Sequence, residues 1–334
     1  GTKTEFEATV NVSGAIRTFA SMILNPRWQG LRGFLRFTGI VTPDVANDQD
    51  LANDVMRPTM DRDLLAESGL GEEDVPVLLA ALLRGSKRVE RVALSGGAVW
   101  IKRYGTERAS RWMVLQRMLA NLIRAPFLRP SPLLADEGMA AREIRRIAQF
   151  SAHDVPTARV IYSSGAAVVF SDAGETVDRQ LYHVLNNDPV AHDNMLVHCA
   201  GELGRLHAKG LCHGRPYPRD MFLKDGRVGF MDFEEEPDRV MPLEVAQARD
   251  IWLLFLQVAT RAKLGGETHD RAYKAWADVA PAAAVAELRK LTGFLGGFLS
   301  AARLIGRVHM GSDLRRFIVA TSYLKHVFVN YRQD

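Results

Sequence analysis

Apolar and polar positions alternate over two stretches in the middle of the chain, residues 87–104 and 155–172. A strand places successive side chains on opposite faces, and the glycines inside each stretch suit a tight turn, so both stretches predict β-hairpins. A third, shorter hairpin is predicted over 221–233, where MFL and RVGFMDF flank the turn sequence KDG.

Helical periodicity marks other segments. Apolar residues recur at helical spacing over 107–124, and helices are also predicted over 73–84 and 136–150. From Thr176 onward helices dominate, apart from the third hairpin. The apolar run at 251–259 is too short to cross a bilayer and predicts a core helix.

This layout predicts an α+β fold with a small sheet lobe and a larger helical lobe. Residues 1–85 form an N-terminal extension of mostly helix and loop. Residues 86–172 form the small lobe, which carries a basic helical insertion at 107–130. Residues 173–334 form the helical lobe.

Composition narrows the class of protein. The chain has 334 residues with ordinary globular apolar and charged fractions. Its two cysteines, Cys199 and Cys212, have no metal-ligand spacing and cannot form a disulfide framework, which predicts buried thiols in a reducing compartment. The first residues lack the basic and apolar regions of a signal peptide, so we expect a cytoplasmic protein.

The net charge of +4 is unevenly spread. Between Arg84 and Arg129 there are eleven lysines and arginines but two acids, Glu90 and Glu107. This excess favours an anionic partner such as a phosphate, an acidic membrane face or nucleic acid, and a solvated basic helix face explains it equally well.

The densest group of chemically versatile residues is CHGRPYPRDMFLKDGRVGFMDFEEE, at 212–236. A helix leads to Gly210, and a loop with two prolines follows, which cannot continue that helix. The predicted hairpin then places Asp220 just before its first strand and Asp232 at the end of its second. Two carboxylates at neighbouring strand ends can share a divalent cation, and oxygen ligands of this kind suit Mg²⁺.

The segment HGRPYPRD…MDFE resembles the catalytic and metal loops of the protein-kinase-like fold. It is most similar to the lipopolysaccharide (Kdo/heptose) kinase branch, which is related to aminoglycoside phosphotransferases. The resemblance places His213 on the motif His, Arg215 on the catalytic Asp and Asp220 on the metal-binding Asn. Asp232 and the two residues after it fall on D-F-G.

Other segments extend the resemblance across residues 95–255, in the order of the family. VWIKRY resembles the strand with the phosphate-binding Lys, here Lys102, and REIRRIAQF resembles the helix whose Glu, here Glu143, pairs with it. The segment around Asp172 resembles the hinge that holds adenine. Asp250 in ARDIWLL resembles the Asp that braces the catalytic loop.

The resemblance implies that MgATP binds between the lobes. Lys102 would hold the α- and β-phosphates and Glu143 would orient Lys102. Asp220 and Asp232 would hold Mg²⁺. It also implies a two-lobed kinase-like fold and a phosphotransferase activity.

Arg215 departs from the family pattern, because a guanidinium cannot act as a base near neutral pH. Three interpretations stay open. Arg215 clamps a phosphate on an anionic acceptor, with the base role moved to Glu234, Glu235, Asp220 or water. Alternatively, it pairs with those acids in a pseudokinase, or its role is purely structural.

Two further departures concern the nucleotide site and the membrane. Before Lys102 only SGG is present, so Gly96 and Gly97 are either a shortened phosphate cover or a plain hairpin turn. Forty-one residues separate Lys102 from Glu143, and the basic helix 107–124 lies between them. That helix either lies on an anionic membrane surface or packs on the small lobe.

The sequence therefore predicts, first, an ATP-dependent phosphotransferase of the lipopolysaccharide-kinase type. Its acceptor would be a hydroxyl of a sugar, a glycolipid or another anionic molecule, and no nucleic-acid partner is expected. The alternative is a pseudokinase that binds nucleotide or a partner and regulates cell-envelope processes, and a protein Ser/Thr kinase comes third. The expected location is the cytoplasm, including the periphery of the inner membrane.

Overall fold

A computed structural model describes residues 71, 73–105 and 126–330 of the chain. The first two predicted hairpins join into one antiparallel four-stranded sheet of order β1-β2-β4-β3. Its strands are β1 Val89–Leu94, β2 Gly97–Arg103, β3 Val160–Ser164 and β4 Ala167–Ser171. Both hairpins are confirmed, and the central pairing of β2 with β4 sets Ile101 opposite Val169.

Each face of the sheet is covered by a helix. On one face, Leu78 of α4 (Asp74–Arg84) packs with Val92, Ile101 and Val169 in a small apolar cluster. On the other, Val168 and Phe170 join the main core together with α6 (Asp136–Ala152). The end of the predicted extension therefore packs on the sheet. The rest of it, and the basic segment 107–124, lie outside the described residues.

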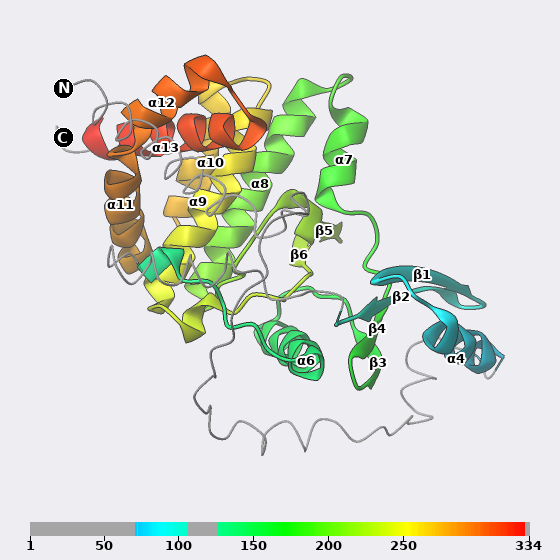
Figure 1. Cartoon of the computed structure of the whole chain (residues 1–334). Coiled ribbons are helices and arrows are strands. Elements are labelled where there is room, and N and C mark those ends of the chain that lie inside the picture. The colour runs from blue at the N-terminus through cyan, green and yellow to red at the C-terminus, as the bar shows by residue number, and fades with distance from the viewer. Residues whose placement is uncertain (1–70, 72, 106–125, 331–334) are drawn as a thin grey trace, which may run out of the picture.

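The chain after the sheet is mostly helical (Figure 1). Its helices are α7 Val177–Val184, α8 Pro189–Ala208, α9 Leu243–Arg261, α10 Gly266–Ala277, α11 Ala282–Gly296, α12 Leu299–Val308 and α13 Ser312–Asn330. The third predicted hairpin is confirmed as β5 (Met221–Lys224) and β6 (Arg227–Phe230), and it lies between the sheet and the helices. Short 3-10 turns occur at Pro126–Leu128, Pro218–Asp220 and Pro237–Arg239.

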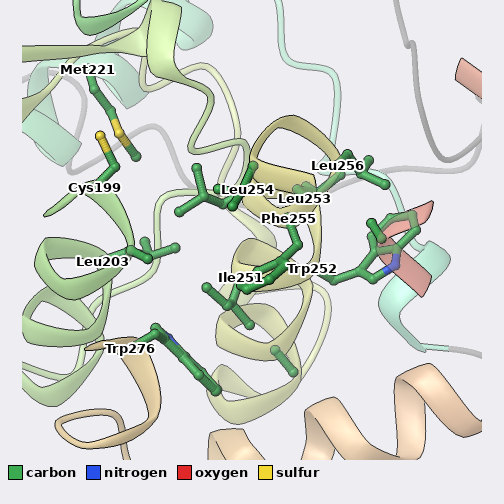
Figure 2. Packing of buried hydrophobic residues seen from close by; sticks show 14 of the residues in the cluster. Cys199, Leu203, Met221, Ile251, Trp252, Leu253, Leu254, Phe255, Leu256 and Trp276 are labelled. Carbon is green, nitrogen blue, oxygen red and sulfur yellow. The ribbon is translucent and has the colours of Figure 1, made fainter. Parts of the chain in front are cut away.

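Helix α9 is the centre of the helical region. Every residue from 250 to 259 is buried, which is the pattern of a helix surrounded by other helices. Figure 2 shows Ile251 and Phe255 of α9 projecting among side chains such as Leu203 of α8 and Trp276 of α10. The predicted core helix at 251–259 is thus confirmed.

The architecture is α+β, with an antiparallel four-stranded sheet followed by a mostly helical region, consistent with a two-lobed arrangement. Within the described ranges, no helix combines the length and the apolar character needed to cross a bilayer.

Candidate functional site

Because successive side chains of β2 lie on opposite faces of the sheet, Lys102 points away from the small apolar cluster beneath α4. Ile101 faces α4, so Lys102 beside it faces α6 and the helical region. Its ammonium Nζ lies 2.6 Å from Glu143 Oε2 on α6, 2.7 Å from Asp232 Oδ1 and 2.9 Å from Glu234 Oε1. The structure thus brings together three predicted residues, Lys102, Glu143 and Asp232, and adds Glu234.

The surroundings of Lys102 keep it charged. Burial opposes its positive charge, but Glu143 and Asp232 outweigh that effect and raise the pKa of Lys102 well above its ordinary value. The Tyr104 hydroxyl donates to Glu143 Oε2, and burial with the neighbouring Glu143 charge raises the pKa of that hydroxyl. The Arg88 guanidinium pairs with Glu234. Sequence reasoning missed Tyr104 and Arg88 as partners of the two glutamates.

Glu143, Asp232 and Glu234 offer carboxylate oxygens that all lie within 4.8 Å of one another. Such a set has the spacing of metal ligands, but here the Lys102 ammonium lies among all three. The cluster therefore holds a side-chain cation. Asp220, predicted to share a cation with Asp232, is not part of this set.

Asp250 organises the loop that begins at His213. Its Oδ2 accepts from the His213 backbone N–H at 2.5 Å, and its Oδ1 accepts from the Gly214 N–H at 2.8 Å. His207 Nε2 lies 3.5 Å from the same carboxylate. Burial alone would raise the pKa of Asp250, but His207 and the backbone donors hold it below its ordinary value. This contact matches the bracing position predicted for Asp250.

Both ring nitrogens of His213 are used. Nε2 lies 3.1 Å from the Met231 carbonyl oxygen and donates to it, while Nδ1 accepts from the Arg215 N–H at 3.3 Å. Burial lowers the pKa of His213 to about 4, so the ring is neutral at neutral pH. His213 therefore ties its own loop to the end of the β5–β6 hairpin.

Gly214 is required for this loop to pack. Its φ of +103° is one that side chains rarely adopt, and a Cβ there would lie 2.7 Å from Cβ of Glu235. The loop at Gly214 thus packs directly against Glu235 and Pro237 of the segment after Asp232. Asp232 itself has a φ of +66°, an uncommon conformation for a non-glycine residue. Such strain is often found where a side chain must point in one direction for function.

Arg215 bridges the two aspartates of the hairpin. Its Nη2 lies 2.7 Å from Asp232 Oδ2, and its Nε lies 3.5 Å from Asp220 Oδ2. Burial works against its charge, but Asp232 and Asp220 raise the pKa of Arg215 above its ordinary value. Asp232 consequently touches one cation with each oxygen, Lys102 and Arg215.

Asp220 is the least satisfied acid of the site. It is 5 % exposed, and its Oδ2 has no hydrogen-bond partner within the described parts of the chain. Burial, with the charge of Asp232, raises the pKa of Asp220 to about 6. The backbone of Met231 donates to the Asp220 carbonyl oxygen at 2.9 Å, which fixes the two ends of the hairpin side by side as predicted.

Arginines on α6 attach that helix to the two loops. Arg142 donates to the Glu234 carbonyl oxygen at 2.9 Å, and Arg146 donates to the Cys212 carbonyl oxygen. Arg145 pairs with Glu236. Sequence reasoning missed these roles, although REIRRI sets three arginines at helical i, i+3 and i+4 positions around Glu143.

Three predicted nucleotide-site residues lie elsewhere. Gly96 lies in the β1–β2 turn and Gly97 is the first residue of β2, so both are at the opposite end of β2 from Lys102. Asp172 follows β4, where its Oδ1 accepts from the Gly174 N–H at 3.0 Å and its Oδ2 lies 3.4 Å from Arg91. The nucleotide-binding role of these three residues stays a prediction.

Compared with known proteins, the chain matches no family model and no curated protein sequence.

Proposed function

We propose that this chain is an ATP-dependent phosphotransferase with a two-lobed protein-kinase-like fold, acting on a hydroxyl of a sugar or glycolipid. One observation carries the proposal. Lys102 on the sheet contacts Glu143 on α6 and Asp232 after the β5–β6 hairpin, beside a loop braced by Asp250. This is the arrangement expected of a nucleotide-phosphate site of that fold.

The side chains divide the binding work. Lys102 would bind phosphate oxygens of the nucleotide, and Glu143 and Tyr104 hold its ammonium in place. The acids fit a divalent cation, since Asp220 has a buried oxygen without a hydrogen-bond partner and lies beside the Asp232 charge. Asp220 and Asp232 would hold Mg²⁺, which neutralises phosphate charge when bound. Arg215 would then release at least one of its two aspartates.

Arg215 supplies charge to the site and no base. Freed from an aspartate, its guanidinium would bind an anionic oxygen of the transferring phosphate or of the acceptor. The other acids of the segment are engaged, because Glu234 contacts Lys102 and Arg88, and Glu235 pairs with Arg249. Because Asp220 would be taken up by the cation, water is the remaining candidate to accept the proton of the acceptor hydroxyl, and the transfer would depend on positioning and charge.

The connection from Asp232 to α9 favours a small acceptor over a protein. It contains one 3-10 turn, Pro237–Arg239, and Glu236 is buried against the α6 arginines. Protein kinases place a long activation segment here. The buried connection leaves no comparable segment to receive a peptide, which makes the protein Ser/Thr kinase the weakest of the three candidates.

MgATP binding tests the proposal, measured by calorimetry and thermal shift on wild type, Lys102→Ala and Asp232→Ala. We expect metal-dependent binding in the wild type and its loss in both variants. Lys274→Ala, which removes an exposed ammonium from α10, is the matched control and should bind like wild type. Absence of binding at millimolar nucleotide in the wild type would overturn the phosphotransferase proposal.

A pseudokinase is the second candidate, and the 2.7 Å Arg215–Asp232 ion pair favours it. If Arg215 stays on Asp232, it takes the place of a cation there. Nucleotide would then bind equally well with Mg²⁺ or with a chelator, and no ADP would form with any sugar acceptor. The phosphotransferase proposal predicts the opposite on both measurements.

A further inference from the structure

A cavity of about 230 Å³ lies beside the Pro218–Asp220 turn. Four parts of the chain line it: α7, this turn with Tyr217 before it, the end of α9 and the start of α13. The lining includes three arginines and two aspartates, namely Arg219, Arg261, Arg316, Asp178 and Asp313. Lys102, Asp232 and the partners described above for them do not line this cavity, so the cavity is a separate feature.

The side chains that line the cavity include one more arginine than aspartate. Asp178 pairs with Arg261, and Asp313 lies 3.1 Å from Arg316, so both carboxylates already have an arginine. Arg219 is the third cation, and its Nε lies 3.6 Å from Asp220 Oδ1, outside the lining. With three arginines and two aspartates, the lining carries more positive than negative charge, which favours the binding of an anion in the cavity.

Arg261 also has an unused donor. Its Nη2 binds Asp178, while its Nη1 is buried and has no hydrogen-bond partner within the described ranges. A buried donor without a partner costs free energy unless a ligand or water satisfies it. Guanidinium groups bind the oxygens of phosphates and carboxylates, so an anion that reached Arg261 would supply the missing acceptor.

The cavity adjoins the proposed reaction site through a single turn. Arg219 and Asp220 are consecutive residues of the 3-10 turn, with Arg219 lining the cavity and Asp220 contacting Arg215. Arg219 also lies over the Tyr217 ring at 5.4 Å, which holds it at the cavity wall. A molecule anchored in the cavity would therefore have its neighbouring groups beside Asp220.

We propose that this cavity binds an anionic group of the acceptor, a phosphate or a carboxylate on a sugar. The inference rests on the proposed function, and it names the class of acceptor as an acidic sugar. The cavity is smaller than the ~300–1,000 Å³ of pockets that enclose whole drug-sized ligands. It therefore takes one charged group and leaves the rest of the acceptor outside, next to the turn.

The test is calorimetric titration of the full chain with glucose 6-phosphate, glucuronate and glucose. These probes offer a phosphate, a carboxylate and no charge. We expect glucose not to bind, and one or both of the charged sugars to bind. The stronger of the two identifies the anionic group. Charged sugars that bind no better than glucose, while MgATP still binds, would overturn the cavity proposal and leave the proposed function standing.

Variants locate the binding. Arg261→Gln and Arg316→Gln should each weaken binding of the charged sugar at least tenfold and leave MgATP affinity unchanged. Arg307→Gln, an exposed arginine on α12, is the matched control. If Arg261→Gln loses folding through its Asp178 pair, Arg316→Gln still decides. Sugar binding unaffected by both variants would overturn the assignment to this cavity, and sugar binding in a protein that does not bind MgATP would overturn the acceptor role.

Discussion

The helical half and the sheet half of the molecule differ in what fills their interiors. Around α9 the interior is a continuous apolar cluster that includes Trp252, Phe255 and Trp276. Between α4 and the sheet lies a small cluster of six buried residues, one of them, Leu78, from α4. Between the halves lie charges, since Lys102 contacts Asp232 and Arg88 contacts Glu234. Apolar packing therefore sets the stability, and ion pairs set how the two halves meet.

Truncation in the helical core should have the largest effect. Phe255 is fully buried, and its ring is stacked on Tyr323 with centroids 5.5 Å apart. Phe255→Ala removes that packing and leaves a cavity, so we expect a loss of about 3–5 kcal/mol in the free energy of unfolding. Urea denaturation measures it, with Leu304→Ala on the exposed face of α12 as control. A loss as small as that of the control would refute the central role of α9.

Removing the cation between the halves comes next. Lys102→Met leaves Glu143, Asp232 and Glu234 facing one another, and losing one partner of a buried ion pair costs about 3 kcal/mol at pH 7. The loss should shrink toward pH 5, because burial raises the pKa of Glu143, and protonation of that carboxyl relieves the uncompensated negative charge. Denaturation at both pH values checks this. Equal losses at pH 5 and pH 7 would show that the ammonium acts only through packing.

Asp220→Asn should act in the opposite direction. Burial raises the pKa of Asp220 from 3.8 to about 6, so its charge lowers the stability of the folded state as pH rises through that range. The wild type and the variant should unfold alike only at about pH 2, well below both pKa values, where Asp220 is protonated in the folded and the unfolded state. At pH 7 the variant should be more stable, on the order of 2 kcal/mol. A less stable variant at pH 7 would mean that Arg215 stabilises the ionised carboxylate.

A matched pair of small substitutions gives the finest test of the comparison. Ile101 in the sheet and Ile251 in α9 are both fully buried, so each Ile→Val change should cost about 1 kcal/mol locally. Native-state hydrogen exchange shows which elements each substitution destabilises. We expect Ile101→Val to speed exchange about fivefold in β2 and β4 without affecting α9. Equal acceleration in both halves would show that they open as one unit.

The local pattern of apolar and polar residues was sufficient to predict most helices and strands, but it did not predict how they pack together. Alternation predicted the three hairpins, and the apolar run at 251–259 predicted the buried helix, because these features depend on neighbouring residues. The pairing of β2 with β4 joins segments about seventy residues apart, and no local periodicity encodes such a contact. The resemblance supplied the Lys102–Glu143 contact, which spacing alone does not indicate.

The candidate site shows the same division. Its motif residues, such as His213 and Asp232, stand in one short segment and could be selected from the sequence. The side chains that complete the site come from distant parts of the chain, as with Arg88 just before β1 and Arg142 from α6. Their roles depend on which face of a strand or helix turns inward, and only the assembled structure decides that.

The partners of Lys102 also set an order of events during synthesis. Lys102 emerges from the ribosome well before Glu143, and Asp232 and Glu234 emerge later still, since about 130 residues separate Lys102 from Asp232. The strand β2 can pair with β4 only after Ser171 has emerged. A chain released before residue 232 would hold Lys102 with Glu143 but without Asp232 and Glu234, which also raise the pKa of Lys102. The sheet half is thus synthesised first, but the ion pairs of Lys102 are complete only after Glu234 has emerged.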